Sequence, residues 1–94
     1  MRIGYFALTE QGFALARRLN EQWPGEIFPK ADLKQHMEEA WGRLDALVCV
    51  MAAGIVVRHM APLLRGKDKD PAVIVMDIRG QWVISLLSGH LGGA

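Results

Sequence analysis

The 94-residue chain has the length of one domain, and 51% of its residues are hydrophobic while 22% are charged. This balance excludes intrinsic disorder. Eleven Lys and Arg residues against ten Asp and Glu give a formal net charge of +1, so the charge gives no case for nucleic-acid binding. The apolar stretches are shorter than the roughly 20 residues that span a bilayer, and the N-terminus lacks the features of a secretory signal. We therefore expect a cytoplasmic domain without a membrane partner.

The first third of the chain predicts a strand, a helix and a second strand. The short apolar run at 2–8 is typical of a buried strand, and Thr9 can cap a helix over 10–22. Residues 26–28 form a second strand candidate between two prolines. The apolar positions expected to face the core from the helix are Phe13, Ala14, Ala16, Leu19 and Trp23.

A second helix is predicted next, followed by the clearest strand of the chain. Asp32 and Gln35 have the spacing of a capping box, and Glu39 with Arg43 forms a favourable pair four residues apart. Residues 45–51 are apolar on both faces, as interior parallel strands are. The apolar face expected of the second helix comprises Leu33, Met37, Ala40, Trp41 and Leu44.

The last part of the chain predicts a third helix and a hairpin. Residues 55–64 have helical apolar spacing, and Pro62 should kink this helix or end it early. A polar loop over 65–70 should be exposed. Two apolar runs, 72–76 and 82–87, are separated by turn residues that include glycine, which indicates an antiparallel hairpin.

The alternation of strands and helices predicts an α/β fold. We expect residues 1–94 to form a single domain with a mostly parallel sheet of about five strands, helices on both faces and a C-terminal antiparallel hairpin. A domain of this size buries only about 60–65% of its unfolded surface, so it gains stability from a second copy or a partner domain.

Ligands of open α/β sheets bind at the carboxyl ends of the strands. Three segments, 9–12, 52–55 and 88–90, are predicted to lie at such ends, and each offers small residues with free backbone amides that can hold a phosphate or carboxylate. The alternative is that each is a strand-to-helix turn that needs glycine for its backbone. None matches a nucleotide-binding motif, so a nucleotide-binding domain is unsupported.

Only a few side chains are candidates for catalysis or for ligand binding. His90 is a candidate for acid–base catalysis, although an exposed loop histidine is an alternative, and Arg58 is a candidate for carboxylate recognition. Ser88 stands near His90, but no third member of a triad is visible. Cys49 is the single cysteine, which excludes an intrachain disulfide and favours a buried structural thiol. No residues have metal-ligand spacing, so we expect no metal held by the protein.

Four motifs in a fixed order resemble one known family. They span 53–58, 61–63, 69–77 and 83–94, with Gly80 before the last. The chain resembles the N-terminal domain of CbiG, the cobalt-precorrin-5A hydrolase of anaerobic cobalamin biosynthesis, most densely from residue 45 onward. Ile78 departs from the pattern, which commonly has an acidic residue there. Family proteins continue through an Asn into a middle and a C-terminal domain, which this sequence does not include.

The resemblance implies a reaction, and the candidate residues found above suggest a site for it. The family opens the lactone ring of cobalt-precorrin-5A with water, releases acetaldehyde and leaves cobalt-precorrin-5B. Cobalt belongs to this anionic tetrapyrrole substrate, so no protein cofactor is expected. His90 would transfer a proton, while carboxylates or an oxyanion would contact backbone amides and Arg58. The expected ligand-binding residues are Gly54, Ile55, Arg58, Ser88, Gly89, Gly92 and Gly93. The alternative is a non-catalytic binding or assembly module that contacts the absent CbiG domains or forms a homodimer.

Overall fold

Five strands form one sheet in the order β2-β1-β3-β4-β5 within the residues that the computed structural model describes, which are 1–66 and 68–88. β1, β2, β3 and β4 run parallel, and β5 pairs antiparallel with β4. The α/β fold with a mostly parallel sheet and a C-terminal hairpin is therefore confirmed. The strands are β1 (Ile3–Ala7), β2 (Glu26–Ile27), β3 (Ala46–Val50), β4 (Ala72–Met76) and β5 (Val83–Ser88).

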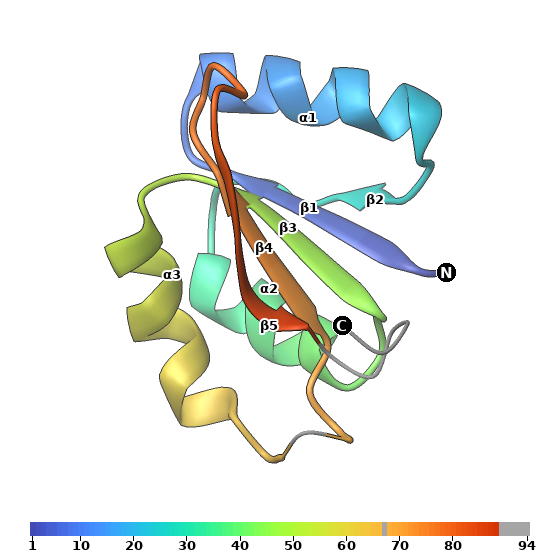
Figure 1. Ribbon diagram of the computed structural model, residues 1–94, viewed down its shortest axis with the longest axis vertical. Coiled ribbons are helices and arrows are strands. Elements are labelled where there is room, and N and C mark those ends of the chain that lie inside the picture. The colour runs from blue at the N-terminus through green and yellow to red at the C-terminus, as the bar shows by residue number, and fades with distance from the viewer. Residues whose placement is uncertain (67, 89–94) are drawn as a thin grey trace.

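Helices cover both faces of this sheet, as expected. The helices are α1 (Glu10–Gln22), α2 (Leu33–Trp41), α3 (Ala53–Met60) and the short 3₁₀ helix η1 (Ala61–Leu63). In the part of the chain that the structure describes, α1 lies alone on one face, whereas α2 and α3 lie together on the other (Figure 1). This arrangement separates the apolar core into two layers, one on each side of the sheet.

The larger core layer lies under α2 and α3. Every residue of β3 is buried, and Leu47 and Cys49 point into this layer. Phe28 follows β2 and stacks on Phe6 of β1 with ring centroids 4.6 Å apart. The face predicted for α2 is confirmed, because Met37 and its neighbours Ala40, Trp41 and Leu44 are buried and Leu33 packs against them.

The face predicted for α1 is partly wrong. The helix buries Gly12, Leu15 and Ala16, whereas Ala14 is exposed and Trp23, at the C-cap, is 55% exposed. Positions three and four residues apart share one helix face, and the stripe that meets the sheet begins at Gly12. The sequence pattern predicted that the buried stripe begins at Phe13, whereas Phe13 is only half-buried.

Helix ends show which local predictions hold. Thr9 caps α1 as predicted, since its hydroxyl accepts a hydrogen bond of 3.0 Å from the Gly12 amide. The capping box predicted at Asp32 is wrong: Asp32 has φ of 58°, in the left-handed region, and its side chain caps no amide. A capping box needs an extended N-cap residue whose side chain reaches back to the helix, and a left-handed backbone does not provide that geometry.

The third helix begins at Ala53, two residues earlier than predicted, and ends at Met60. Pro62 then lies in the short 3₁₀ helix η1, which confirms the expected early end. Proline lacks the amide hydrogen that a continuing α-helix would need, so the tighter turn follows.

Candidate functional site

The carboxyl edge of the parallel strands brings the first two predicted segments together. β1 and β3 are neighbours, with Ala7 paired to Val50, so the chain leaves both strands side by side. A Cβ atom at Gly12 would lie 3.3 Å from the Val50 carbonyl oxygen and 3.2 Å from the Ala7 side chain. The start of α1 therefore packs against the end of β3, and position 12 accommodates only glycine without a shift.

The start of α3 is open. Its N-cap, Ala52, has no side chain that can accept a hydrogen bond, and the first turn holds no acidic residue. Gly54 is exposed, and apart from its chain neighbours and the backbone of its own helix, no heavy atom of the described residues lies within 4 Å of the position that a Cβ would take there. The amides at a helix N-terminus attract anions, so this end of the sheet offers a place for a carboxylate.

Arg58 stands on the same helix face as Gly54, because residues four apart in a helix are neighbours. Its side chain is exposed, and within the described part of the chain it forms no ion pair. His59, by contrast, has its Nδ1 atom 2.8 Å from the Ile55 carbonyl oxygen, so its ring is held against its own helix. Ile55 is half-buried and packs on the larger core layer. Of these residues, Gly54 and Arg58 are the ones free to meet a ligand.

Ser88, the described residue of the third predicted segment, lies at the opposite edge. β5 runs antiparallel, and Ser88 pairs with Ala72, the first residue of β4. The prediction that residues 88–90 reach the carboxyl ends of the parallel strands is therefore wrong where the chain is described. A hairpin strand reverses direction, so its own carboxyl end lies beside the amino ends of its neighbours. Four residue steps of about 3.3 Å put the two edges about 13 Å apart.

Five of the residues predicted for the site or beside it lie outside the described residues. They are Gly89, His90, Leu91, Gly92 and Gly93. The structure therefore places Gly54, Ile55 and Arg58 on one helix and Ser88 at the far edge of the sheet.

Asp77 closes the hairpin at the carboxyl edge. Its carboxylate accepts hydrogen bonds from the amides of Gln81, at 2.7 Å, and Trp82, at 3.1 Å. Burial acts to raise the pKa of this carboxyl, but hydrogen bonds from the backbone amides of Trp82, Gln81, Arg79 and Asp77 itself together outweigh burial and lower the pKa. The predicted turn is confirmed, and the charge of Asp77 stabilises it. Ile78, which departs from the family pattern, packs with the α1 core layer.

Asp70 is a buried polar residue that the sequence analysis missed. It is 6% exposed, although the sequence predicted an exposed loop over 65–70. Its carboxylate accepts hydrogen bonds from the Trp41 indole at 3.1 Å and from the amides of Arg65 and Gly66 at 2.8 and 3.2 Å. The available signal was the Trp in the apolar face of α2, since a buried indole N–H needs an acceptor. Asp70 ties the loop before β4 to α2.

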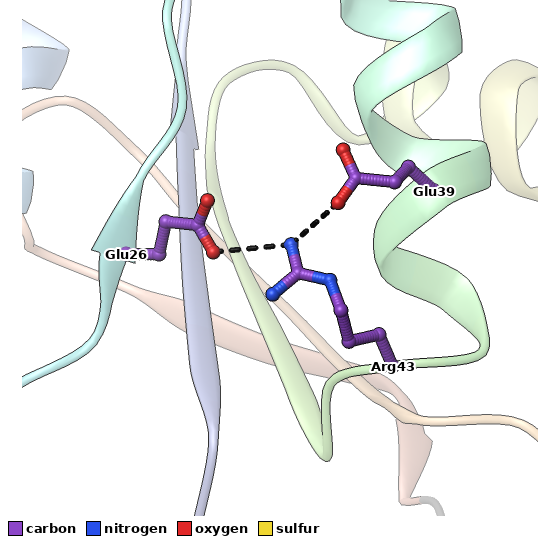
Figure 2. Close-up of polar contacts among 3 residues, drawn as sticks. All are labelled: Glu26, Glu39 and Arg43. Atoms are coloured by element: carbon purple, nitrogen blue, oxygen red, sulfur yellow. Dashed lines mark hydrogen bonds and ion pairs between the residues drawn. The ribbon is translucent and has the colours of Figure 1, made fainter.

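Charged side chains at the amino edge form a separate cluster. Figure 2 shows the Arg43 guanidinium between two carboxylates, with Nη2 2.7 Å from Glu39 and 3.1 Å from Glu26. The predicted pair of Glu39 with Arg43 is confirmed, and Glu26 joins it from β2. The hydrogen bond to Glu26 is the main cause that raises the pKa of Arg43. With both carboxylates already paired to it, this arginine links β2 to α2 and has a structural role.

Two classes of site receive no support in the described residues. Among residues 1–66 and 68–88, no three His, Cys, Asp or Glu side chains are grouped closely enough to hold a metal ion. In the same part of the chain, no helix has both the length and the hydropathy required to cross a membrane.

Known proteins similar to this chain carry consistent names. The chain is 43% identical over 104 aligned positions to cobalt-precorrin-5A hydrolase of Salmonella typhimurium, in an alignment that covers 98% of this chain and 30% of that protein. It is 54% identical over 48 residues to the protein of the same name from Priestia megaterium, covering 51% of this chain and 13% of that protein. The chain thus spans less than a third of the length of these relatives.

A solved structure and a family model agree with these relatives. The crystal structure of a cobalamin biosynthesis protein G homolog from Sulfolobus solfataricus superposes with a TM-score of 0.79 at 28% identity, covering 97% of this chain and 30% of that one. The family model described as "Cobalamin synthesis G N-terminal" matches residues 35–94, which is more than half of the chain. The superposition, the sequence identity and this family match all point the same way, and the chain belongs to the CbiG N-terminal family.

Proposed function

We propose that this chain serves the hydrolysis of cobalt-precorrin-5A in cobalamin biosynthesis and that it binds the tetrapyrrole. The observation that carries this proposal is the 43% identity, along 98% of the chain, to a protein named cobalt-precorrin-5A hydrolase. The reaction opens the lactone ring with water and releases acetaldehyde, and cobalt enters as part of the substrate. We place this reaction in the cytoplasm, in keeping with the short apolar stretches of the sequence.

The start of α3 supports the binding role. Corrin precursors carry acetate and propionate groups, and the amides near Gly54 together with the Arg58 guanidinium suit such carboxylates. A carboxylate held at the helix start would lie one turn from Arg58, so both groups can contact a single acidic side chain of the ligand. The Ile55 amide already donates a hydrogen bond of 3.1 Å to the Ala52 carbonyl oxygen, so Ile55 would lie beside the ligand without offering it a free amide. In this proposal the carboxyl edge is the anion-binding part of the site.

The second group of candidates is Ser88, Gly89, His90, Gly92 and Gly93, of which the structure places Ser88, at the far edge of the sheet. We propose His90 as the proton-transfer residue of the reaction, acting at a different part of the ligand from Arg58. Its neighbouring glycines would let the backbone approach the macrocycle. The two groups have separable roles, because one retains carboxylates and the other would change the rate of ring opening.

Titration of the chain with cobalt-precorrin-5A, followed by its absorption spectrum and by an acetaldehyde assay, tests both roles. Arg58→Ala should weaken binding about 10- to 100-fold, since charge-assisted hydrogen bonds contribute roughly 1.5–3 kcal/mol. Arg18→Ala removes an exposed arginine from α1 and should bind like the unaltered chain. His90→Ala should retain binding and lose acetaldehyde release. Absence of a spectral change with the unaltered chain would contradict the proposal.

The second candidate function is a binding or assembly module without catalysis. It is favoured by the coverage of the relatives, since the chain matches only 30% of the Salmonella protein. Binding of the tetrapyrrole without acetaldehyde release would identify this role. Acetaldehyde release by the chain alone would exclude it.

A further inference from the structure

One face of the sheet is only partly covered. Among residues 1–66 and 68–88, α1 is the one helix that lies there, and beside it is a hollow of about 340 Å³. The floor of the hollow includes Ile3, Val48 and Ile74 from three neighbouring strands, and Leu19 and Trp23 at the end of α1 form one wall. The opposite face carries two helices, α2 and α3 (Figure 1). The uncovered area thus lies where a second helix would stand beside α1.

The chemistry of the hollow is apolar. No charged side chain is among its described lining residues, and the hydroxyl of Tyr5 already donates a hydrogen bond of 2.6 Å to the Trp23 carbonyl oxygen. Trp23 is 55% exposed and Val83, at the β5 side, is 59% exposed. The hollow offers nothing to the carboxylates of an anionic ligand, whereas contiguous exposed apolar residues mark surfaces that bind protein. A protein segment with an apolar face fits it.

The relatives indicate which protein supplies that segment. The matching family model is described as N-terminal. The alignments with the Salmonella and Sulfolobus proteins each cover 30% of those proteins, so most of each relative lies outside the aligned region. β5 ends at Ser88, which pairs with Ala72, and Ala72 lines the hollow. In the longer relatives, the sequence that follows this strand therefore starts at the rim of the hollow. A segment joined to this rim by a short flexible linker would have an effective concentration of about 1 mM.

We propose that the hollow binds an amphipathic helix from the part of the longer family proteins that follows this module. Packed helices lie about 8–10 Å apart, so one helix beside α1 would cover the strands that α1 leaves bare. Its apolar face would meet Ile3, Val48, Ile74 and Val83, and its polar face would remain in water. This surface goes beyond the proposed reaction, since it concerns assembly and holds no substrate.

The test uses the 94-residue chain with labelled methyl groups and a synthetic peptide. The peptide copies the roughly 30 residues that follow the matched region of the Salmonella protein, a length that allows several helical turns. Titration to about 1 mM should shift the methyl resonances of Ile3, Val48, Ile74 and Val83. The methyl groups of Val57, on the other face of the sheet, should not shift. The assay contains no tetrapyrrole, so its failure is distinct from failure of the proposed function.

Two matched variants sharpen the test. Val83→Asp places a charge at the hollow and should weaken peptide binding at least about tenfold. Val57→Asp makes the same change at a residue of α3 that is 43% exposed and should leave binding unchanged. Circular dichroism confirms that both variants are folded. The proposal is overturned if the hollow methyl groups do not shift, if both variants bind equally, or if sedimentation shows that the chain fills the hollow with a second copy.

Discussion

Asp70 shows how one side chain fixes a loop against a helix. Three donors, the Trp41 indole and the amides of Arg65 and Gly66, meet its carboxylate. Burial acts to raise the pKa of Asp70, but the hydrogen bonds from Arg65, Trp41 and Gly66, together with the positive charge of Arg65, outweigh burial and hold the pKa below its ordinary value of 3.8. The ionised carboxylate therefore belongs to the folded state, and β4 begins directly after it.

Asp70→Ala should lower the free energy of unfolding by about 1–3 kcal/mol, because it leaves the buried Trp41 indole without an acceptor. Urea denaturation followed by fluorescence measures this change. Asp68→Ala, at an exposed position of the same loop, should change stability by less than about 0.5 kcal/mol. Equal effects of the two substitutions would show that the carboxylate of Asp70 does not stabilise the fold.

The lowered pKa of Asp70 also predicts a pH dependence. When folding lowers the pKa of a carboxyl group, the ionised group stabilises the folded state. This contribution is complete above the pKa of the unfolded chain, near 3.8, and it is lost as the pH falls through the pKa of the folded state. The stability difference between the unaltered chain and Asp70→Asn should be constant from about pH 5 upward and shrink below about pH 4. Urea midpoints across this range provide the measurement. A difference that grows on acidification would reverse the sign argued here.

Cys49 should be unreactive in the folded chain. Its side chain is fully buried in β3, and burial raises the pKa of the thiol to about 12. The thiolate is the reactive form, so alkylation at pH 8 should proceed only when the chain opens. Mass spectrometry after iodoacetamide treatment should show slow labelling in buffer and rapid labelling in urea. Rapid labelling in buffer would contradict the buried position.

At the scale of elements, helix α1 is anchored at its start by Thr9. The Thr9 hydroxyl accepts a hydrogen bond from the Gly12 amide, and Gly12 in turn packs close to the end of β3. The cap therefore fixes both where the helix begins and how it leaves the carboxyl edge. α3 begins at the same edge without a side-chain cap, which leaves its first amides open to a ligand.

Thr9→Ala should destabilise the fold by about 1 kcal/mol, since it removes the acceptor for the Gly12 amide. Thr9→Ser keeps a hydroxyl at the same place and should restore most of that stability. Thermal unfolding of the three proteins gives the comparison. If Ser and Ala proved equally destabilising, the lost methyl contact would be the cause and the cap would contribute little.

At the scale of the whole molecule, the direction of β5 decides what can share a site. Four parallel strands end at the edge where α1 and α3 begin, whereas β5 ends at the other edge. A ligand held at Gly54 is therefore separated from Ser88 by the length of the sheet. Any joint action of the two groups depends on the size of the ligand and on the course of the chain after Ser88.

Spin labels can measure this separation. In a Cys49→Ser background, labels at Gly54→Cys and Ser88→Cys should lie more than about 13 Å apart, which is the span of four strand residues. Labels at Gly54→Cys and Gln11→Cys, both near the carboxyl edge, should lie closer together. Pulsed electron paramagnetic resonance gives both distances. A shorter distance for the Gly54 and Ser88 pair than for the control pair would contradict the antiparallel placement of β5.

The sequence by itself determined the order and type of the elements. Strand β3 is apolar throughout because both of its faces are buried, and Thr9 and Pro62 mark helix ends through local chemistry. The apolar face of α2 followed from its helical spacing. The motifs that resemble the CbiG family were also visible in the sequence, because glycines and turn residues keep their spacing without reference to tertiary contacts.

Only the tertiary structure decided which of these features lie together. The burial of Asp70 depends on Trp41, which is 29 residues away in the chain, and no local pattern reports such a contact. Asp32 and Gln35 have the residue spacing of a capping box, but the left-handed backbone of Asp32 prevents the capping hydrogen bond from forming. The candidate site is divided for the same kind of reason. The sequence predicted Gly54, Arg58 and Ser88 as ligand-binding residues from their expected places at strand ends and from their chemistry. Strand direction is a property of pairing, however, and the antiparallel pairing of β5 puts Ser88 at the opposite edge of the sheet.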